Sequence, residues 1–401
     1  MAEINPEAQR QAAGRLAATE KEREATRRYV SRGELLKADT PERLEKRKTR
    51  LLADQNLSPT LGPENRFALA ENSVLEAPEG ARRAFERQIG GKDTQPCWFL
   101  TKGVEVRRRV GRIHIRDARR RVGWGTGFLV APNLLVTNQH VLDSLDTARC
   151  SRVEFDHEET FEGEILPSAI FDFAPSVLFM SDPASGGLDY ALIAVESRAR
   201  PDSGRPDAEL AEFGYHALAR AEGKLIKGEL IHSIHHPEGQ PRQVSLRENR
   251  LMAIQDPALQ DIWMHYETDT EQGSSGAPLY NNQWEVVGIH HMGVEKRDQE
   301  GKILAIGGGR WTAEMGGRQK WWQANEGLRI SRFIAHVEAQ VKALRDTSAP
   351  PPPDQVVTKA GLALVEEMLM ASSSSGAGPA PATTTESVSP ARPAATSFSP
   401  E

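Results

Sequence analysis

The sequence of 401 residues lacks the features typical of secreted, membrane-spanning and nucleic-acid-binding proteins. Its only cysteines, Cys97 and Cys150, cannot form a disulfide framework and are expected to be reduced thiols. The first residues, MAEINPEAQR, lack the apolar core of a signal peptide, and no run of about 18 apolar residues occurs. The net charge of −6 provides no global attraction to nucleic acid or to an anionic membrane. These absences favour a soluble, cytoplasmic protein.

The length allows two or three domains, and composition changes along the chain suggest where they meet. We expect a helical, partly ordered extension over 1–60 and a linker with a short helix over 61–103. A main domain is expected over 104–345, and a linker, short helix and disordered tail rich in Pro, Ser and Ala over 346–401. The extension has too few apolar residues for a core of its own. Its helices could pack on the main domain, bind a partner or stay loosely ordered.

The main domain has the pattern of an all-β protein. From about residue 104, short period-two segments rich in Val, Ile and Leu alternate with glycine-rich turns, which is typical of a barrel or sandwich. Residues 327–344 then carry apolar side chains at helical spacing, so the β region is expected to end with a helix. A further short amphipathic helix is expected within 356–370.

The stretch QGSSGAPL at 272–279 lies between two of the expected strands. Glycines on both sides of the serine pair allow a tight turn that exposes successive amide N–H groups to one point. A serine hydroxyl held there can attack a carbonyl while the amides stabilise the oxyanion. Taken alone, such a stretch is more often a simple turn.

Two other residues change this interpretation, because a serine nucleophile needs a base and a carboxylate that orients the base. His140 follows an expected strand and Asp189 precedes another, with separations of 49 (189 − 140) and 86 (275 − 189) residues to the next member. The order His, Asp, Ser is that of chymotrypsin, and the G-x-S-x-G pattern of the α/β-hydrolases fails at Ala277. Ser275, His140 and Asp189 are therefore the candidate catalytic residues.

Four short motifs carry a family resemblance: TGFLV at 126–130, LLVTNQHVL at 134–142, LDYALI at 188–193 and GSSGAPL at 273–279. They resemble the catalytic blocks of trypsin-like (chymotrypsin-fold) serine peptidases, most closely those of bacterial glutamyl endopeptidase-like and intracellular trypsin-like peptidase domains. The resemblance covers about 100–340. It implies a mainly β fold of two six-stranded antiparallel barrels, with the site in the cleft between them and no cofactor.

The same resemblance assigns roles to individual residues. Ser275 would be the nucleophile, His140 the general base and then acid, and Asp189 the orienting carboxylate. The amides of Gly273 and Ser275 would form the oxyanion hole. Ser274 stands where trypsin-like zymogens keep an aspartate, so their activation switch is expected to be absent.

The resemblance also implies a substrate pocket formed by Asp269, Thr270 and His290. Asp269 lies where trypsin-like enzymes keep the acid that selects a basic side chain. Thr270 and His290 match the pair with which glutamyl endopeptidases select an acidic one. Because two positions match rather than one, we favour an acidic residue before the scissile bond and leave the basic alternative open.

Two other residue groups were weighed as binding sites. The histidines at 232, 235, 236, 290 and 291 lack the spacing of zinc ligands, and no cysteine cluster accompanies them, so no metal is expected. The basic run over 107–121 lacks interleaved aromatic residues, so we interpret it as a solvated hairpin face rather than a nucleic-acid site.

The sequence thus predicts a serine endopeptidase that acts through an acyl-enzyme on specific intracellular proteins or peptides. Two alternatives remain, a catalytically silent binding module with the same fold and an esterase that uses the same triad. Because an intracellular peptidase endangers its host, we also expect restraint by a regulatory protein bound to the N-terminal helices, by these helices themselves, or by a narrow choice of target.

Overall fold

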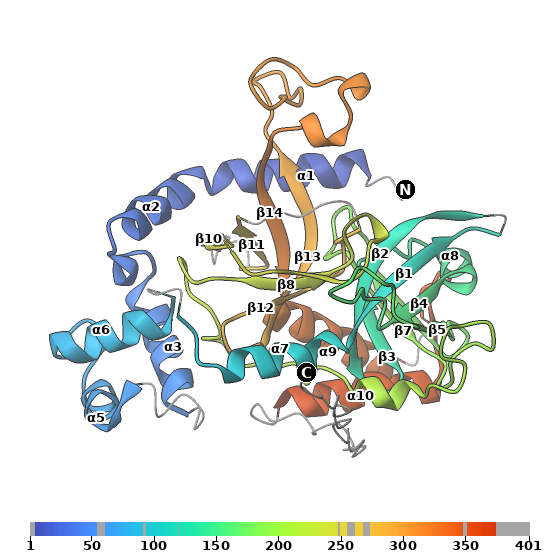
Figure 1. The fold of residues 1–401 in the computed structure, drawn as a ribbon, viewed down its shortest axis with the longest axis horizontal. Helices are drawn as coiled ribbons and strands as arrows, with labels where there is room; N and C mark the ends of the chain where they lie inside the picture. The colour runs from blue at the N-terminus through green and yellow to red at the C-terminus, as the bar shows by residue number, and fades with distance from the viewer. Residues whose placement is uncertain are drawn as a thin grey trace, which may run out of the picture.

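The computed structural model describes residues 5–53, 61–90, 94–118, 120–247, 249–254, 261–267, 273–347 and 351–373. Two antiparallel sheets form the body of the molecule, and helices from both ends of the chain lie around them (Figure 1). The expected mainly β class is confirmed. None of the described helices combines the length and the apolar character that a membrane crossing requires.

The first sheet has eight strands in the order β15-β6-β7-β3-β2-β1-β4-β5. A bridge between Phe173 and Val195 joins the end of β5 to the end of β7 and curls the sheet into a barrel. Alternate residues such as Ile113, Ile115 and Leu135 fill its interior, as period-two strands require. The strands are β1 (Val110–Arg116), β2 (Arg121–Ala131), β3 (Leu134–Thr137), β4 (Arg152–Phe155), β5 (Ala169–Asp172), β6 (Leu178–Asp182), β7 (Tyr190–Ala194) and β15 (Val356–Val357).

The second sheet has seven strands in the order β10-β11-β14-β13-β12-β8-β9. A bridge between Leu230 and Arg250 connects β8 to β10, so six of the strands close on themselves. Leu251, Met264 and Leu279 pack inside this barrel. The strands are β8 (His232–His235), β9 (Gln243–Ser245), β10 (Leu251–Ile254), β11 (Trp263–Tyr266), β12 (Pro278–Tyr280), β13 (Val286–Glu295) and β14 (Trp322–Arg329).

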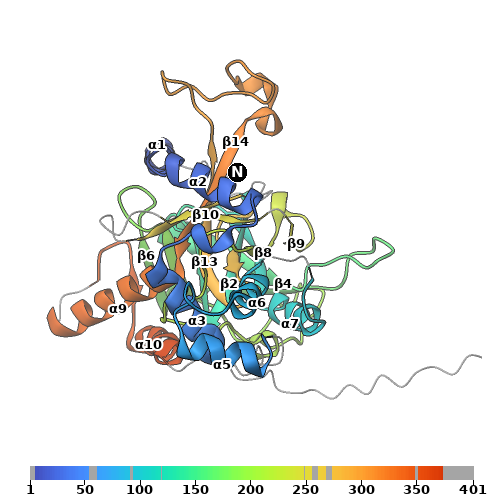
Figure 2. The same cartoon turned by 90° about the vertical axis from the view of Figure 1, so that its left-hand side faces the viewer.

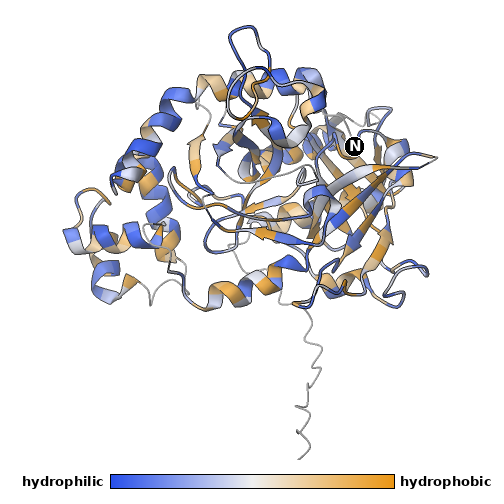
Figure 3. Ribbon diagram, turned by 45° about the horizontal axis from the view of Figure 1, so that its top comes forward, coloured by the Kyte–Doolittle hydropathy of each residue, from blue (hydrophilic) through white to orange (hydrophobic). Residues whose placement is uncertain are grey.

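The hairpin of β13 and β14 extends beyond the second barrel as an arm, and helix α1 (Pro6–Ala18) lies across its base (Figure 1). Ala8, Ala12 and Leu16 of α1 are buried in one cluster with Met292 and Val294 of β13. Three apolar residues at helical spacing are enough to seat this helix, which also contains the hydrophilic residues drawn blue in Figure 3. Of the alternatives left open for the N-terminal helices, the structure shows packing on the main domain.

The chain between α1 and the first barrel contains more helix than expected. The segment 61–103, predicted as a linker with one short helix, holds α5, α6 and most of α7. Leu44, Leu69 and Phe85 form a small core there together with Ile226 of the second barrel. The helices are α2 (Glu20–Ser31), α3 (Pro41–Ala53), α5 (Pro63–Glu71), α6 (Glu79–Gln88) and α7 (Trp98–Arg107). The assignment of domain boundaries itself stays a prediction.

Two helices end the described chain, and both pack against the barrels (Figure 2). Helix α9 (Ile330–Thr347) begins three residues later than expected, because 327–329 complete strand β14. Helix α10 (Lys359–Ser373) overlaps the expected 356–370 region, whose first two residues form β15 instead, and the tail over 374–401 falls outside the described residues. Shorter helices are α8 (Leu145–Cys150), η1 (Leu35–Lys37), η2 (Leu210–Phe213), η3 (Pro237–Gly239), η5 (Ala313–Met315) and η6 (Gly317–Gln319).

A buried ion pair joins α3 to the second barrel. Arg47 Nη2 lies 2.8 Å from Glu229 Oε1, and both side chains are almost completely buried. Burial raises the pKa of Glu229 to about 7 despite the attraction of Arg47. We expect Arg47→Met to lower the free energy of unfolding by about 3–5 kcal/mol, since it leaves a carboxylate buried without its partner.

Urea denaturation at pH 8 measures this loss, which should be smaller at pH 6 because Glu229 can then neutralise itself by taking up a proton. The matched control is Arg83→Met, which removes an exposed arginine paired with Glu79 and should change stability by less than about 1 kcal/mol. If Arg47→Met and Arg83→Met lower the free energy of unfolding equally, the buried pair does not stabilise the protein more than an exposed one.

Candidate active site

His140 and Asp189 meet because the strands that carry them are neighbours. His140 follows β3 and Asp189 immediately precedes β7, and these strands pair through Thr137 and Ala191. His140 Nδ1 lies 2.7 Å from Asp189 Oδ2, while the backbone N of His140 donates to Oδ1 at 3.0 Å. Asn138 Nδ2 donates to the backbone carbonyl of Asp189 at 2.9 Å. The carboxylate therefore orients the imidazole through Nδ1 and leaves Nε2 available as a base.

Asp189 is completely buried and ionised. Burial alone would raise its pKa, but the hydrogen bond and charge of His140, together with the ion pair to His291, outweigh burial and hold the pKa well below its usual range. A permanent negative charge at this position stabilises the imidazolium that forms when His140 accepts a proton.

The loop that carries Ser275 belongs to the second barrel and is docked against the first. Thr126 N of β2 donates to the carbonyl of Ser275 at 2.9 Å, and Thr126 Oγ1 donates to the carbonyl of Gly273 at 2.7 Å. Gly276 lies against Thr126 and Thr137, and Thr137 is only three residues before His140 in the chain. The two barrels thus bring the serine loop and the His140–Asp189 pair to one place.

Ser275 and His140, both among the described residues, are not hydrogen-bonded to each other. Such catalytic hydrogen bonds are often long in the absence of substrate and shorten when it binds. The structure thus brings the three predicted triad residues into one region but shows the hydrogen bond of only one pair.

The structure separates the roles of the two adjacent serines. Ser274 is completely buried, and its hydroxyl lies 2.6 Å from His235 Nδ1, while His235 Nε2 lies 3.1 Å from Ser245 Oγ. Burial lowers the pKa of His235 to about 4, so its imidazole is neutral at neutral pH. Ser275 is only half-buried, which makes it the serine that substrate can reach.

The backbone of the same loop can stabilise an oxyanion. Gly273 and Gly276 have φ values of 99° and 85°, in the left-handed region that favours glycine. Within the described part of the chain, the amide groups of Gly273 and Ser275 donate no hydrogen bond. Free amides on a glycine-rich turn are the donors that an oxyanion hole requires.

Gly276 offers a test of how tightly this loop is held. A Cβ atom at position 276 would lie 2.2 Å from Thr126 O and 2.3 Å from Thr137 Oγ1, so Gly276→Ala must displace the loop. We expect this variant to lower kcat by on the order of 100-fold, because a small displacement of the nucleophile is costly.

The matched control is Gly301→Ala, since Gly301 also has a positive φ of 77° but no atom within 4 Å of the added Cβ. Steady-state kinetics on a peptide substrate measure both variants. A Gly276→Ala enzyme as active as Gly301→Ala would show that close docking of the loop does not matter.

The structure describes one of the three predicted pocket residues, since Asp269 and Thr270 lie outside the described residues. His290 is buried in β13, with Nδ1 at 2.5 Å from the hydroxyl of Tyr266. Burial lowers the pKa of His290 to about 3, so the ring is neutral at neutral pH. Burial also raises the pKa of Tyr266 well above its usual value, so its hydroxyl stays protonated and donates a hydrogen bond to His290 Nδ1. Nε2 of His290 then carries the ring hydrogen and is a donor.

Two further residues, His291 and Glu326, belong to the site, although the sequence did not predict them as part of it. His291 Nε2 lies 3.2 Å from Asp189 Oδ2 in an ion pair without hydrogen-bond geometry. His291 Nδ1 lies 2.9 Å from Glu326 Oε1. The register shifts between His290 and Met292, so His291 occupies a β-bulge, which can redirect a side chain. Simple alternation along the strand gives no signal for this placement.

His140, Asp189 and His291 also form the one group of three potential metal ligands among the residues that the structure describes. Their contacts are those of a histidine–carboxylate–histidine arrangement around Asp189. Two other histidines have different partners: His232 Nε2 lies 2.8 Å from Asn282 Oδ1, and His235 Nδ1 lies 2.6 Å from Ser274 Oγ.

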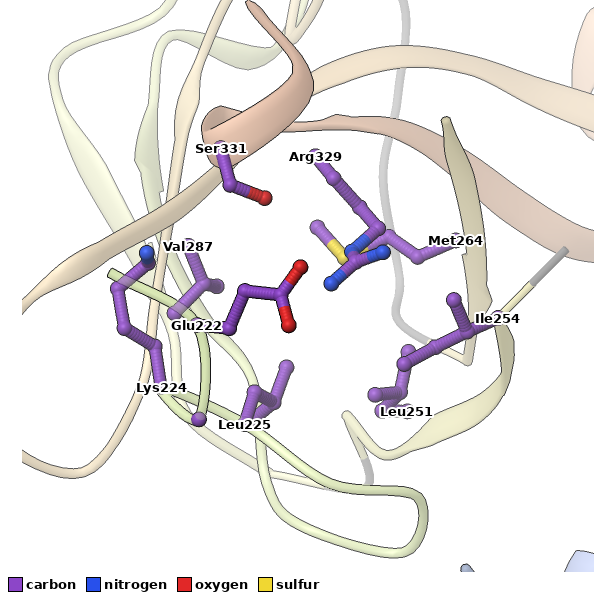
Figure 4. A pocket seen from close by; sticks show the side chains of 10 residues that line it. Glu222, Lys224, Leu225, Leu251, Ile254, Met264, Val287, Arg329 and Ser331 are labelled. Atoms are coloured by element: carbon purple, nitrogen blue, oxygen red, sulfur yellow. The ribbon is translucent and has the colours of Figure 1, made fainter. Parts of the chain in front are cut away.

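A small cavity of about 30 Å³ lies elsewhere, inside the second barrel (Figure 4). Leu251, Met264 and Val287 form its apolar side, and Glu222 and Arg329 form its polar side. It is large enough for a water molecule but not for a peptide side chain. We therefore assign it no part in the site.

The comparison with protein-family models agrees with the site. Residues 125–289 match the sequence model of the trypsin-like peptidase domain. A curated relative, "Uncharacterized protein y4fB" of Sinorhizobium fredii (strain NBRC 101917 / NGR234), is 35% identical over 291 residues, or 69% of this chain. That alignment covers 43% of the relative, so the chain spans less than half of its length.

Among solved structures, a crystal structure of the Rv3671c protease from M. tuberculosis in its active form matches with a TM-score of 0.37 and 18% identity. The match covers 68% of this chain and 93% of that one. The family match includes His140 and Asp189 as well as the Ser275 loop. Residues 125–289 therefore resemble trypsin-like peptidase domains.

Proposed function

We propose that the chain is a serine endopeptidase that hydrolyses peptide bonds through an acyl-enzyme. The observation that carries this proposal is the docking of the glycine-flanked Ser275 loop beside the hydrogen-bonded His140–Asp189 pair. The family match of residues 125–289 supports the peptidase class.

The proposed reaction begins when Ser275 Oγ attacks the carbonyl carbon of the scissile peptide bond. Nε2 of His140 takes the hydroxyl proton, and the new oxyanion accepts hydrogen bonds from the amides of Gly273 and Ser275. His140 then gives the proton to the leaving amine, the C–N bond breaks, and an ester to Ser275 remains. A water molecule releases the ester by the same proton path, with Asp189 stabilising each imidazolium.

We further propose that the enzyme prefers an acidic residue before the scissile bond. The neutral His290 ring, fixed by Tyr266, offers an Nε2–H donor that can bind a carboxylate without a charge of its own. Thr270 would supply a second polar contact. Asp269 would favour a basic residue instead, so the two assignments give opposite cleavage preferences.

One experiment tests both activity and preference. Purified protein is incubated with a fluorophosphonate probe and with a peptide library, and mass spectrometry identifies the labelled residue and the cleaved bonds. We expect covalent labelling at Ser275 and cleavage after Glu or Asp. Labelling with cleavage after Lys or Arg would overturn the acidic preference alone.

The alternatives give different outcomes of the same experiment. An esterase would be labelled and would hydrolyse ester substrates but no peptide in the library. A silent binding module would neither be labelled nor cleave any substrate, although circular dichroism would show it to be folded. We propose protein targets in the cytoplasm and a regulatory partner of the N-terminal helices as the biological setting.

A further inference from the structure

Asp189 is the first member of a set of charged side chains that runs through the interior and ends at the partly exposed Arg15 on helix α1. We call this set the charge network; it consists of Asp189, His291, Glu326 and Arg15. Glu326 of β14 is completely buried and accepts two hydrogen bonds from Arg15. Arg15 Nε donates to Oε2 at 2.8 Å, and Arg15 Nη2 donates to Oε1 at 2.6 Å. His265 adds a contact from Nε2 to Oε2 at 3.1 Å.

The charges of the network balance. Asp189 and Glu326 are two buried anions, and His291 and Arg15 are the two cations that separate and terminate them. Burial alone would lower the pKa of His291, but the two carboxylates raise it to about 9. Burial alone would raise the pKa of Glu326, yet Arg15 and the two histidines hold it well below its usual range. A buried carboxylate is stable only with such partners, so removal of one cation affects the others.

An aromatic contact reinforces the link between α1 and His291. The guanidinium of Arg15 lies 4.4 Å from the ring centroid of Trp263, and the ring of Trp263 stacks on His291 at 4.7 Å. Trp263 therefore lies in contact with both cations. Because α1 is also seated by apolar residues on β13, the position of Arg15 is determined by the docking of the whole helix (Figure 1).

We propose that Arg15, Glu326 and His291 are positioning residues for the peptidase reaction, so that the docked helix α1 is a working part of the active site. Through this network, α1 holds Asp189, and Asp189 holds the ring of His140. Undocking of α1 would remove Arg15 from Glu326, leave this buried carboxylate with His265 and His291 alone, and weaken the support of the triad. This inference rests on the proposed serine peptidase function.

The test compares Arg15→Met with Arg10→Met in the full chain. Arg10 lies on the same helix and is exposed, and its side chain pairs with Glu7. We expect Arg15→Met to lower kcat by about 10-fold with KM changed by less than about 3-fold, because Arg15 acts through the triad. Arg10→Met should behave as wild type. Arg47→Met serves as a second control, since it is destabilising but lies outside the network.

Two further measurements separate a positioning role from general loss of stability. A cavity of about 890 Å³ borders Arg15, so a small cation can reach the space left by Arg15→Ala. Millimolar guanidinium should therefore restore kcat in Arg15→Ala but not in His291→Gln, in which a different group is missing.

His291→Gln should also move the acidic limb of the kcat/KM profile to higher pH, because loss of a cation beside Asp189 favours the protonated form of His140. The protonation of His291 depends on the titratable and charged groups around it. These groups are Asp189, His140, His290 on its own strand, Glu326, and through Glu326 also His265 and Arg15.

The outcomes are distinguishable from those of the proposed function. If wild type is not labelled by a fluorophosphonate, the peptidase proposal fails and no variant comparison is needed. If wild type is labelled but Arg15→Met keeps the kcat of Arg10→Met, the network inference is wrong. The inference is also wrong if Arg47→Met loses kcat in the same proportion to its loss of stability as Arg15→Met does.

Discussion

Ser275→Ala should lower kcat by on the order of 10⁴-fold or more, by analogy with knockouts of other serine triads. The variant lacks the hydroxyl that forms the acyl-enzyme, so fluorophosphonate labelling should disappear completely. Any remaining hydrolysis would come from the oxyanion hole and from substrate binding. Burst kinetics with an activated ester and intact-mass measurement of the acyl-enzyme provide the two readouts.

The matched control is Ser274→Ala, one residue away in the same loop. Ser274 is buried against His235, so its loss should cost about 1–3 kcal/mol of stability by leaving a ring nitrogen unpaired. Labelling of Ser275 should persist at temperatures where the variant is folded. If Ser274→Ala abolishes labelling and Ser275→Ala does not, the nucleophile has been assigned to the wrong serine.

Asp189→Asn should reduce kcat by about 10⁴-fold while the protein stays folded. The amide cannot accept both hydrogen bonds that His140 makes to the carboxylate, from its backbone N and from Nδ1, in the same way. The ring then favours the wrong tautomer and loses the charge that stabilises its protonated form. Activity should recover partly at high pH, where a base other than His140 can act.

Asp172→Asn is the control for Asp189→Asn, because Asp172 is a partly exposed carboxylate of the same barrel that pairs with Arg152 and Arg200. It should change kcat by less than about 3-fold. Steady-state kinetics across pH 5–10 compare the two, a range chosen to include the ordinary histidine pKa of about 6.5. An Asp189→Asn enzyme with wild-type kcat at neutral pH would exclude Asp189 from the triad.

The candidate catalytic residues could be proposed from the sequence because each one lies in a local motif. Short-range constraints act on such motifs: Gly276 needs a positive φ, and His140 and Asp189 lie at the ends of short apolar strands. The all-β pattern of the main domain was readable for the same reason, since side-chain alternation is a property of each strand by itself.

The N-terminal region was less predictable. Helix α1 has few apolar residues, and only the complementary surface of β13 shows that Ala8, Ala12 and Leu16 are enough to seat it. In the same way, the helices between α3 and the first barrel are stabilised by contacts with distant residues such as Ile226. Propensity and composition contain no information about such partners, which is why the segment 61–103 was predicted mainly as linker.

The sequence by itself determined the order and local setting of His140, Asp189 and Ser275, because spacing and turn chemistry are written in neighbouring residues. Tertiary structure alone decided which other groups support them. His291 reaches Asp189 because a β-bulge interrupts the alternation of β13, and Glu326 lies beside it because β13 and β14 pair in one particular register. Arg15 comes from more than 300 residues away and completes the network only because α1 docks there. Register and docking result from the packing of the whole molecule, so no local pattern could have revealed them.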